Sequence, residues 1–251
     1  MYLPDFFNLA KGFHQHFRLV VANTEALRQE AYHIRHQVYC EELGWEAVRP
    51  DRLETDAHDA NALHLLIQAC VGDVFIGCVR LVLVDAHNPA QPLPFEDACA
   101  HSLDRSLCDP TRLPRKKIAE VSRLAVIARY RRRRGEAGRP VSVNDENFGS
   151  VDNPRFPYIP VGLYLGILEL ARLHGLSTLF MLTEPHLASH FGKFGVSIIQ
   201  IGTAVEHRGS RIPSMMQAES VLNGMSRLVR PLYKAIAQDV AESMGNMARA
   251  S

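Results

Sequence analysis

Residues 62–84, ALHLLIQACVGDVFIGCVRLVLV, contain two apolar runs separated by the turn sequence Val-Gly-Asp at positions 71–73. Runs of this length, rich in branched apolar residues and bounded by turn residues, are typical of β-strands. The stretch therefore predicts an antiparallel hairpin. Because both runs are almost continuously apolar, we expect the hairpin to be buried within a sheet.

A helix is predicted before this hairpin. Thr24 can cap it, and the helix would run to about Glu42. Its apolar residues recur at helical spacing: Leu27, Ala31, Ile34 and Val38. Arg35 and Tyr39 are four residues apart, so we expect them to share a neighbouring face, one turn from each other.

The chain after the hairpin alternates between strand and helix patterns. Strands are predicted at residues 117–127, 176–183, 196–202 and 212–218. Helices are predicted at residues 160–175, at 184–195, and on either side of Pro231 in the tail. This order predicts an α/β (or α+β) fold built on one central mixed sheet with flanking helices. Ligands tend to bind near the strand ends of such crossover units.

Composition indicates an ordinary globular protein. The chain has 251 residues, 47% of them hydrophobic and 22% charged, with a formal net charge of +1. A charge this small favours neither a nucleic-acid nor a membrane partner. The five cysteines are odd in number and form no C-x-x-C pair, which predicts reduced thiols. The sequence shows no signal-peptide pattern and no apolar run of the ~20 residues that span a bilayer, so we expect a soluble cytoplasmic protein.

Charged residues occur where strand patterns call for apolar ones. Arg80 interrupts the second hairpin strand, and Glu120 and Arg123 interrupt the strand at 117–127. The acidic stretch ETDAHD at 54–59 stands directly before the hairpin. Each charge alone is typical of a solvated surface. Together they favour a buried, mutually neutralised network that could also bind an amine. Since Glu120 and Arg123 are three apart, only a β-bulge would bring them to one face, and the sequence shows no bulge.

The basic stretch RRRRGEAG at 131–138 permits three interpretations. Its R-x-x-G-x-A pattern suits a loop whose backbone amides hold a pyrophosphate, although no helix follows at once. A solvated loop and a docking patch for an acidic partner, with residues 115–117 nearby, are the alternatives. His186 and His190 are one helical turn apart, but without an evident third ligand we expect surface histidines and no metal site.

In type and spacing, the charged residues resemble the signature of the acyl-homoserine-lactone (autoinducer) synthases. The N-terminal part of that signature is matched by Arg35, Tyr39, Trp45, Asp56 and Asp59. Arg80, in the sequence GCVR, resembles the arginine of the family's G-x-x-R strand. Glu120 and Arg123, in EVSR, resemble its E-x-S-R strand. The match covers about residues 20–130.

Later segments resemble relatives of those synthases more closely. The stretch after the E-x-S-R strand, the HRGSRIP segment at 207–213 and the C-terminal helix look like those of N-acyl amino acid synthases and PEP-CTERM/exosortase-associated acyltransferases. The resemblance implies a GNAT-like acyl-CoA N-acyltransferase fold with a twisted sheet and a splayed strand pair. It also implies an N-terminal segment at 1–19, an acyltransferase domain at 20–217 and a C-terminal helical extension at 218–251.

The resemblance implies transfer of a fatty acyl group from acyl carrier protein, or acyl-CoA, to a primary amine, first of all that of an amino acid. Glu120 and Arg123 would be catalytic, with Glu120 as the base. The acceptor would be bound by Arg35, Tyr39, Trp45, Asp56, Asp59 and Arg80. The donor would be bound by Arg131, Arg132, Arg133, Arg134 and Gly135. The expected partners are acyl carrier protein and a small amine, with no nucleic acid, no metal and no permanently bound cofactor.

Three alternatives stay open at this point. The first is an acyl-homoserine-lactone synthase that uses S-adenosylmethionine as acceptor. The second is an acetyltransferase that uses acetyl-CoA, which the R-x-x-G-x-A loop would favour. The third is a non-catalytic regulator of the same fold that binds nucleic acid or a protein through its arginines.

Overall fold

The predicted hairpin lies inside the main sheet of the computed structural model, which describes residues 9–131, 149–150, 153–154, 156–184, 192 and 196–245. β2 (Ala62–Ala69) pairs antiparallel with β3 (Val74–Leu83). Gly72 and Asp73 in the turn have positive φ angles of 81° and 49°, which a hairpin turn favours and which glycine adopts without strain. Most residues of both strands are buried, as the sequence predicted.

The sheet is mixed, with eight strands in the described part of the chain. Its order is β1-β2-β3-β4-β7-β10-β8, with β9 paired to β10. The remaining strands are β1 (Phe17–Val21), β4 (Ile118–Val126), β7 (Thr178–Thr183), β8 (Ile199–Gln200), β9 (Val205–Glu206) and β10 (Ser210–Gln217). β5 (Gly149–Ser150) and β6 (Asn153–Pro154) form a separate pair.

β4 and β7 run parallel, and they separate part-way along their length. The pairing covers Ile118–Val121 on β4 and Thr178–Met181 on β7. β4 continues to Val126 and remains paired with β3 on its other side. The described strands therefore contain the splayed pair that the family resemblance implied, and the gap opens just beyond Val121, the residue after Glu120.

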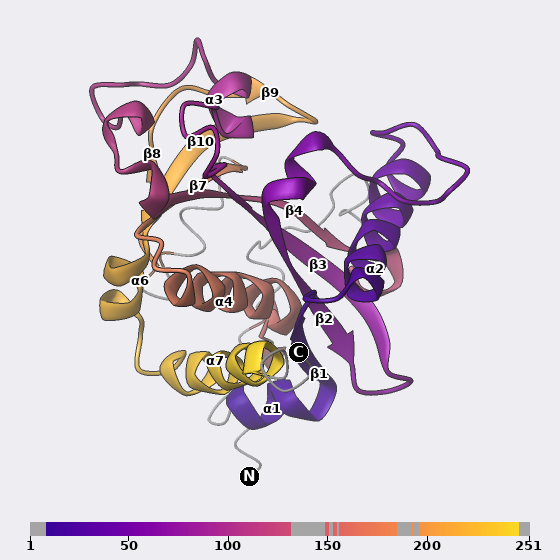
Figure 1. The fold of residues 1–251 in the computed structure, drawn as a ribbon. Helices are drawn as coiled ribbons and strands as arrows, with labels where there is room; N and C mark the ends of the chain where they lie inside the picture. Colours follow the sequence, from indigo (N-terminus) through magenta and orange to yellow (C-terminus); the bar gives the residue numbers. More distant parts are fainter. Residues whose placement is uncertain are drawn as a thin grey trace.

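Helices cover both faces of this sheet (Figure 1). α2 (Glu25–His36) lies on one face, capped by the Thr24 side chain as predicted, and continues as a π-helix at Gln37–Glu42. α4 (Tyr158–Leu173) lies on the other face, beside α7 (Arg230–Gly245) and α1 (Leu9–His16). α4 is buried along most of its length, which explains its nearly uniform apolar sequence. α3 (Pro94–Ala98) and α6 (Ala218–Gly224) are short.

Several element boundaries differ from the sequence predictions. The strand expected at 196–202 is reduced to β8 at Ile199–Gln200, which pairs with β10 as expected. The break in the C-terminal helices falls at residues 225–229, and Pro231 lies in the first turn of α7, where a missing N–H costs nothing. The helix predicted at 184–195 lies mostly outside the described residues.

β1 and α7, which come from opposite ends of the described chain, lie together at the edge of the sheet. All five residues of β1 pair with β2, so the boundary expected after residue 19 falls inside a strand. The backbone N–H of Leu19 donates to Asp239, and that of Val21 donates to Ser243, at 3.2 and 2.9 Å. α7 thus supplies side-chain acceptors to the exposed edge of β1, which blocks pairing with another chain.

The hydrophobic core forms two clusters. The larger lies between the sheet and its helices and includes Phe13, Leu65 and Leu163. The smaller lies under the loop that precedes β4, where Phe95 stacks on Phe180 at 4.5 Å between ring centroids. Because Phe95 also contacts Glu120 through its backbone, this second cluster positions the loop against the gap between β4 and β7.

Candidate active site

A β-bulge in β4 brings Glu120 and Arg123 to the same cavity. Cys78 is opposite Ala125 and Arg80 is opposite Ser122, so two β4 residues, Arg123 and Leu124, face one residue of β3. Arg123 has a positive φ of 53°, which is unusual for a residue with a side chain. The extra residue resolves the spacing problem of the sequence, because it turns Arg123 toward the side of the sheet where Glu120 lies.

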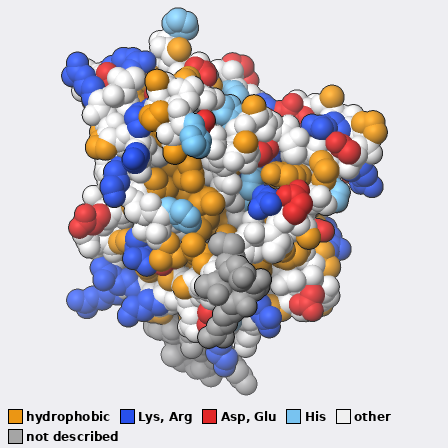
Figure 2. All heavy atoms as spheres, in the orientation of Figure 1, with side chains coloured by type: hydrophobic (Ala, Val, Ile, Leu, Met, Phe, Trp, Pro, Cys, Tyr) orange, Lys and Arg blue, Asp and Glu red, His pale blue; other side chains and the backbone are white. Residues whose placement is uncertain are grey.

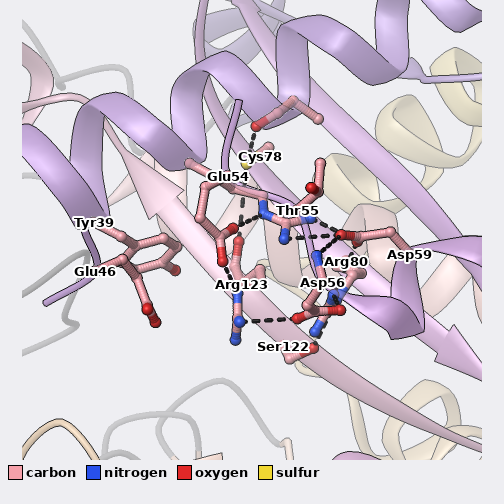
Figure 3. A network of polar contacts seen from close by, with 12 residues as sticks. Tyr39, Glu46, Glu54, Thr55, Asp56, Asp59, Cys78, Arg80, Ser122 and Arg123 are labelled. Carbon is pink, nitrogen blue, oxygen red and sulfur yellow. Dashed lines mark hydrogen bonds and ion pairs between the residues drawn. The ribbon is translucent and has the colours of Figure 1, made fainter. Parts of the chain in front are cut away.

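A network of ion pairs lies beside this bulge (Figure 3), formed by Arg35, Arg80 and Arg123 with Glu54, Asp56 and Asp59. Arg123 donates from Nε to Glu54 at 3.2 Å and from Nη2 to Asp56 at 2.9 Å. Arg80 donates from Nη1 to Asp56 at 2.7 Å and to Asp59 at 2.9 Å. Buried charges are tolerated only when they are paired and hydrogen-bonded, and here each arginine contacts two carboxylates.

Arg35 is the most deeply buried member of this charge network. Its side chain is 0% exposed; Nε pairs with Glu54, and the two terminal nitrogens grip Asp59 at 2.6 and 3.1 Å. Burial alone would lower the pKa of Arg35, but the hydrogen bonds and charges of Asp59 and Glu54 raise it. Burial would raise the pKa of Asp59, and the bonds from Arg35 and the charge of Arg80 lower it well below its ordinary value. Arg35 and Asp59 are therefore both charged at neutral pH.

A short 3-10 helix (Ala57–Asn61) holds the two aspartates in place. Asp56 caps it by accepting the N–H of His58 at 2.9 Å, and Asp59 accepts the N–H of Asp56 at 2.8 Å. This reciprocal capping box fixes both carboxylates by local hydrogen bonds that do not involve the arginines. The acidic stretch ETDAHD is thus a rigid element of the site.

Glu120 differs from the other acids because no arginine binds it directly among the described residues. The residue is only 4% exposed, and its Oε2 accepts a hydrogen bond from the backbone N–H of Phe95 at 2.7 Å. Burial raises the pKa of Glu120 to about 7, against the smaller lowering effects of the Phe95 bond and the charges of Arg80 and Arg123. A carboxyl group that titrates near neutral pH is suited to accept and release a proton.

The cavity at the gap has a volume of about 380 Å³, within the roughly 300–1,000 Å³ typical of small-molecule sites. It unites six of the residues predicted from the sequence: Tyr39, Trp45, Asp56, Arg80, Glu120 and Arg123. Arg35 and Asp59 do not line it; they lie behind it and fix Asp56 and Arg80 through the charge network. Their predicted role in acceptor binding stays a prediction, and in this structure they support residues that line the cavity.

Two aromatic residues after α2 close one side of the cavity. Tyr39 and Trp45 stack at 6.0 Å between ring centroids, with an interplanar angle of 16°. The guanidinium of Arg123 lies 5.9 Å from the Tyr39 ring, and the Tyr39 hydroxyl donates to the Leu124 carbonyl at 3.0 Å. The π-helix displaces Tyr39 from regular helical geometry, as such turns often do at functional sites.

The donor residues predicted from the sequence are mostly untested. Arg131 pairs with Glu42, whose carboxylate also accepts the N–H of Ala128 at 3.1 Å. Residues 132–135 lie outside the described residues, as do the two histidines of the predicted helix, His186 and His190. Burial raises the pKa of the Cys78 thiol to about 12, so this thiol is not ionised at neutral pH. The described residues contain no group of three or more His, Cys, Asp or Glu positioned to hold a metal ion.

Sequence reasoning missed several residues of the site. Glu54 is part of the charge network, and its place in the acidic stretch was a usable signal. Ser122 accepts from Arg80 at 3.2 Å and lines the cavity. Tyr164 and Glu184 line it from α4 and from the residue after β7, and three residues of the HRGSRIP segment line it as well: His207, Arg208 and Arg211. Nothing local in the sequence marks Tyr164.

Comparisons with known proteins agree with this geometry. Residues 34–139 match the family described as the acetyltransferase (GNAT) domain. TofI, solved with an inhibitor and MTA, is 19% identical with a TM-score of 0.56 over 82% of this chain and 95% of TofI. The chain has a GNAT-like fold. No curated protein gave a significant match.

Two further GNAT-fold structures are similar. The CoA-dependent acyl-homoserine lactone synthase BjaI, solved with SAM and isopentyl-CoA, is 18% identical with a TM-score of 0.56 over 91% of this chain and 99% of BjaI. FeeM, an N-acyl amino acid synthase from uncultured soil microbes, is 16% identical with a TM-score of 0.54 over 83% and 95%. At these identities the likeness concerns the fold. None of the helices within the described ranges has the length and apolarity needed to cross a bilayer.

Proposed function

We propose that this GNAT-fold protein is an N-acyltransferase that moves a fatty acyl group from acyl carrier protein or acyl-CoA to the primary amine of an amino acid. The observation that carries the proposal is Glu120, a buried carboxyl group with a pKa raised by burial to about 7, at the point where β4 and β7 part. The charge network beside it forms one wall of a cavity large enough for an amino acid.

The reaction uses Glu120 as the proton acceptor. An amino acid enters as an ammonium ion, and the ionised carboxylate of Glu120 takes one proton to give the free amine. The amine nitrogen then forms a bond to the thioester carbonyl carbon, and the C–S bond breaks. The departing thiolate receives the second proton from nitrogen. The products are an amide and a free thiol, and Glu120 returns its proton to solvent.

Backbone N–H groups of β4 that face the gap beyond Val121 would stabilise the negative charge that develops on the thioester oxygen. β4 backbone groups at Ser122–Val126 extend past the last residue paired with β7, and the Leu124 carbonyl already binds Tyr39 on the cavity side. Amide N–H groups held in place by a sheet are effective oxyanion donors, because they need no reorganisation during the reaction.

The acyl chain requires an apolar surface next to this gap. Figure 2 shows hydrophobic side chains gathered on the face where Figure 1 places β7 and α4. Leu124 and Leu182 line the cavity near the same strands. We propose that the acyl chain extends from the thioester carbonyl over this apolar surface. The basic segment that begins at Arg131 would bind the phosphopantetheine arm or the acidic carrier protein in the cytoplasm.

The experiment is mass spectrometry of lipid extracts from cells that express the wild-type protein or the Glu120→Gln variant. A new fatty acyl amino acid in the wild-type extract alone is the expected result. A second candidate function, lactone synthesis from S-adenosylmethionine, is favoured by the residues shared with acyl-homoserine-lactone synthases and would give an acyl-homoserine lactone instead. Neither product in wild-type cells, with the protein folded and abundant, would reject N-acyl transfer to these acceptors.

A further inference from the structure

The β9–β10 hairpin places a group of basic side chains over the cavity. His207, Arg208 and Arg211 all line it. The turn is tight: Arg208 and Gly209 have positive φ angles of 54° and 94°, and the N–H of His207 donates to the Gly209 carbonyl at 3.0 Å. The Gly209 N–H is held by the Glu206 carboxylate at 2.9 Å. The turn therefore presents these three side chains in a fixed arrangement.

These basic side chains are additional to the charge network, in which arginines and carboxylates already balance. Arg208 pairs with Glu46 at the mouth of the site. Nη1 of Arg211 lies 3.4 Å from Oε1 of Glu184, too far for a good charge-assisted hydrogen bond. Nη1 of Arg211 also donates to the Ser210 carbonyl at 3.3 Å, so within the described residues both contacts of this guanidinium involve Nη1, and Nε and Nη2 can donate to another anion.

The field around the hairpin is positive. Burial lowers the pKa of His207, and the charges of Arg123 and Arg211 lower it further. Burial also lowers the pKa of Arg208, with a further lowering from Arg35. Burial disfavours a charge of either sign, but the contributions of Arg123, Arg211 and Arg35 show that neighbouring guanidinium groups place positive charge close to the hairpin, where it attracts an anion. An anionic group of the acceptor would therefore be favoured at this hairpin.

We propose that the β9–β10 hairpin, with Arg211 as its main contact, binds the α-carboxylate of the acceptor, while Glu120 receives the proton of the α-amine. The proposal rests on the proposed function and adds the residues that select α-amino acids over simple amines. It holds for a free amino acid and for S-adenosylmethionine, since both carry an α-carboxylate next to the reacting amine. Arg211 can bind a carboxylate through two parallel N–H bonds, with Glu184 as the group that is displaced.

The test compares three acceptors that share one side chain: the amino acid, its carboxamide and the amine without the carboxyl carbon. The wild-type protein and Arg211→Gln are assayed for kcat/KM with a saturating acyl donor. One charge-assisted contact is worth roughly 10- to 100-fold, so the wild type is expected to prefer the amino acid by at least that ratio. In Arg211→Gln the ratio falls to within a few-fold of one. Arg112→Gln, which removes an arginine whose side chain is 85% exposed and does not line the cavity, keeps the wild-type ratio.

Two outcomes would overturn this assignment while leaving acyl transfer intact. One is a wild-type protein that acylates the carboxamide as well as the amino acid. The other is an Arg211→Gln variant that loses activity on all three acceptors in equal proportion, which is the behaviour of a merely structural residue. Failure of the wild type to acylate any acceptor would instead reject the proposed function. Binding of the amino acid to both proteins, measured by calorimetry without donor, gives a readout independent of turnover.

Discussion

The buried carboxyl group of Glu120 should make stability and activity respond in opposite directions to one substitution. Its pKa is raised by burial from the ordinary 4.5 to about 7. In the unfolded chain the group titrates at its ordinary value, so between these two pH values the folded state binds the proton more tightly. By linkage, the stability that this group contributes is complete below pH 4.5 and is lost as the pH rises to about 7.

The size of the effect follows from the same two pKa values. Each pKa unit corresponds to 1.36 kcal/mol, so ionising Glu120 in the folded protein costs about 3 kcal/mol above pH 7. Glutamine removes this cost, because it is neutral at every pH and its side-chain oxygen can still accept the Phe95 N–H. We therefore expect Glu120→Gln to match the wild type near pH 4.5 and to be more stable by about 3 kcal/mol at pH 8.

The measurement is urea unfolding of both proteins at a series of pH values, with the slope of the transition checked for constancy. Glu219→Gln, a change at an exposed position in α6, is the control and should follow the wild type throughout. Acyl-transfer activity should rise with pH through about 7 in the wild type and be absent in Glu120→Gln. If the difference in stability between the wild type and Glu120→Gln stays constant from pH 4.5 to 8, the reasoning is refuted. Ionisation of Glu120 would then cost the folded protein no stability.

Three further outcomes follow from the contacts of the site. Asp59→Asn leaves Arg35 buried without its bidentate partner and should lower the free energy of unfolding by about 3–5 kcal/mol; the exposed Asp51→Asn should change it little, and urea unfolding compares the two. Because the pKa of Asp59 is lowered, its contribution is present above its ordinary pKa and lost as the pH falls through the lowered value, so Asp59→Asn should flatten the acid side of a stability–pH profile. Tyr39→Phe removes the hydrogen bond to the Leu124 carbonyl. It should lower kcat in steady-state kinetics while changing the thermal unfolding midpoint only slightly.

The hairpin and the helix before it could be predicted because their signals are local. Turn residues, apolar periodicity and the Thr24 cap each act within a few residues of where they stand. The strand β1 could also have been found, since its sequence FRLVV is a short apolar run. Its pairing could not, because the residues that complete its edge, Asp239 and Ser243, come from the far end of the chain.

The bulge in β4 was not predictable for a different reason. A position with positive φ is usually marked by glycine or asparagine, and here it is Arg123. No local preference favours that conformation; it is sustained by distant contacts, since the Arg123 guanidinium binds Glu54 and Asp56 and its carbonyl accepts from the Cys78 thiol at 3.8 Å. Strain at such a site persists only where the surroundings determine it fully.

The bulge also explains why the charge network and the proposed catalytic base lie in one place. Without the extra residue, Arg123 would face the opposite side of β4, leaving Glu54 and Asp56 short of one positive charge in a buried site. With it, the acidic segment is drawn onto the sheet beside the point where β7 departs. Glu120, which precedes the bulge, then faces a cavity whose walls are held by ion pairs that it does not share. In the proposed reaction the network residues act through the position of those walls, whereas Glu120 acts through its own proton. This difference follows from which carboxylates the three arginines reach.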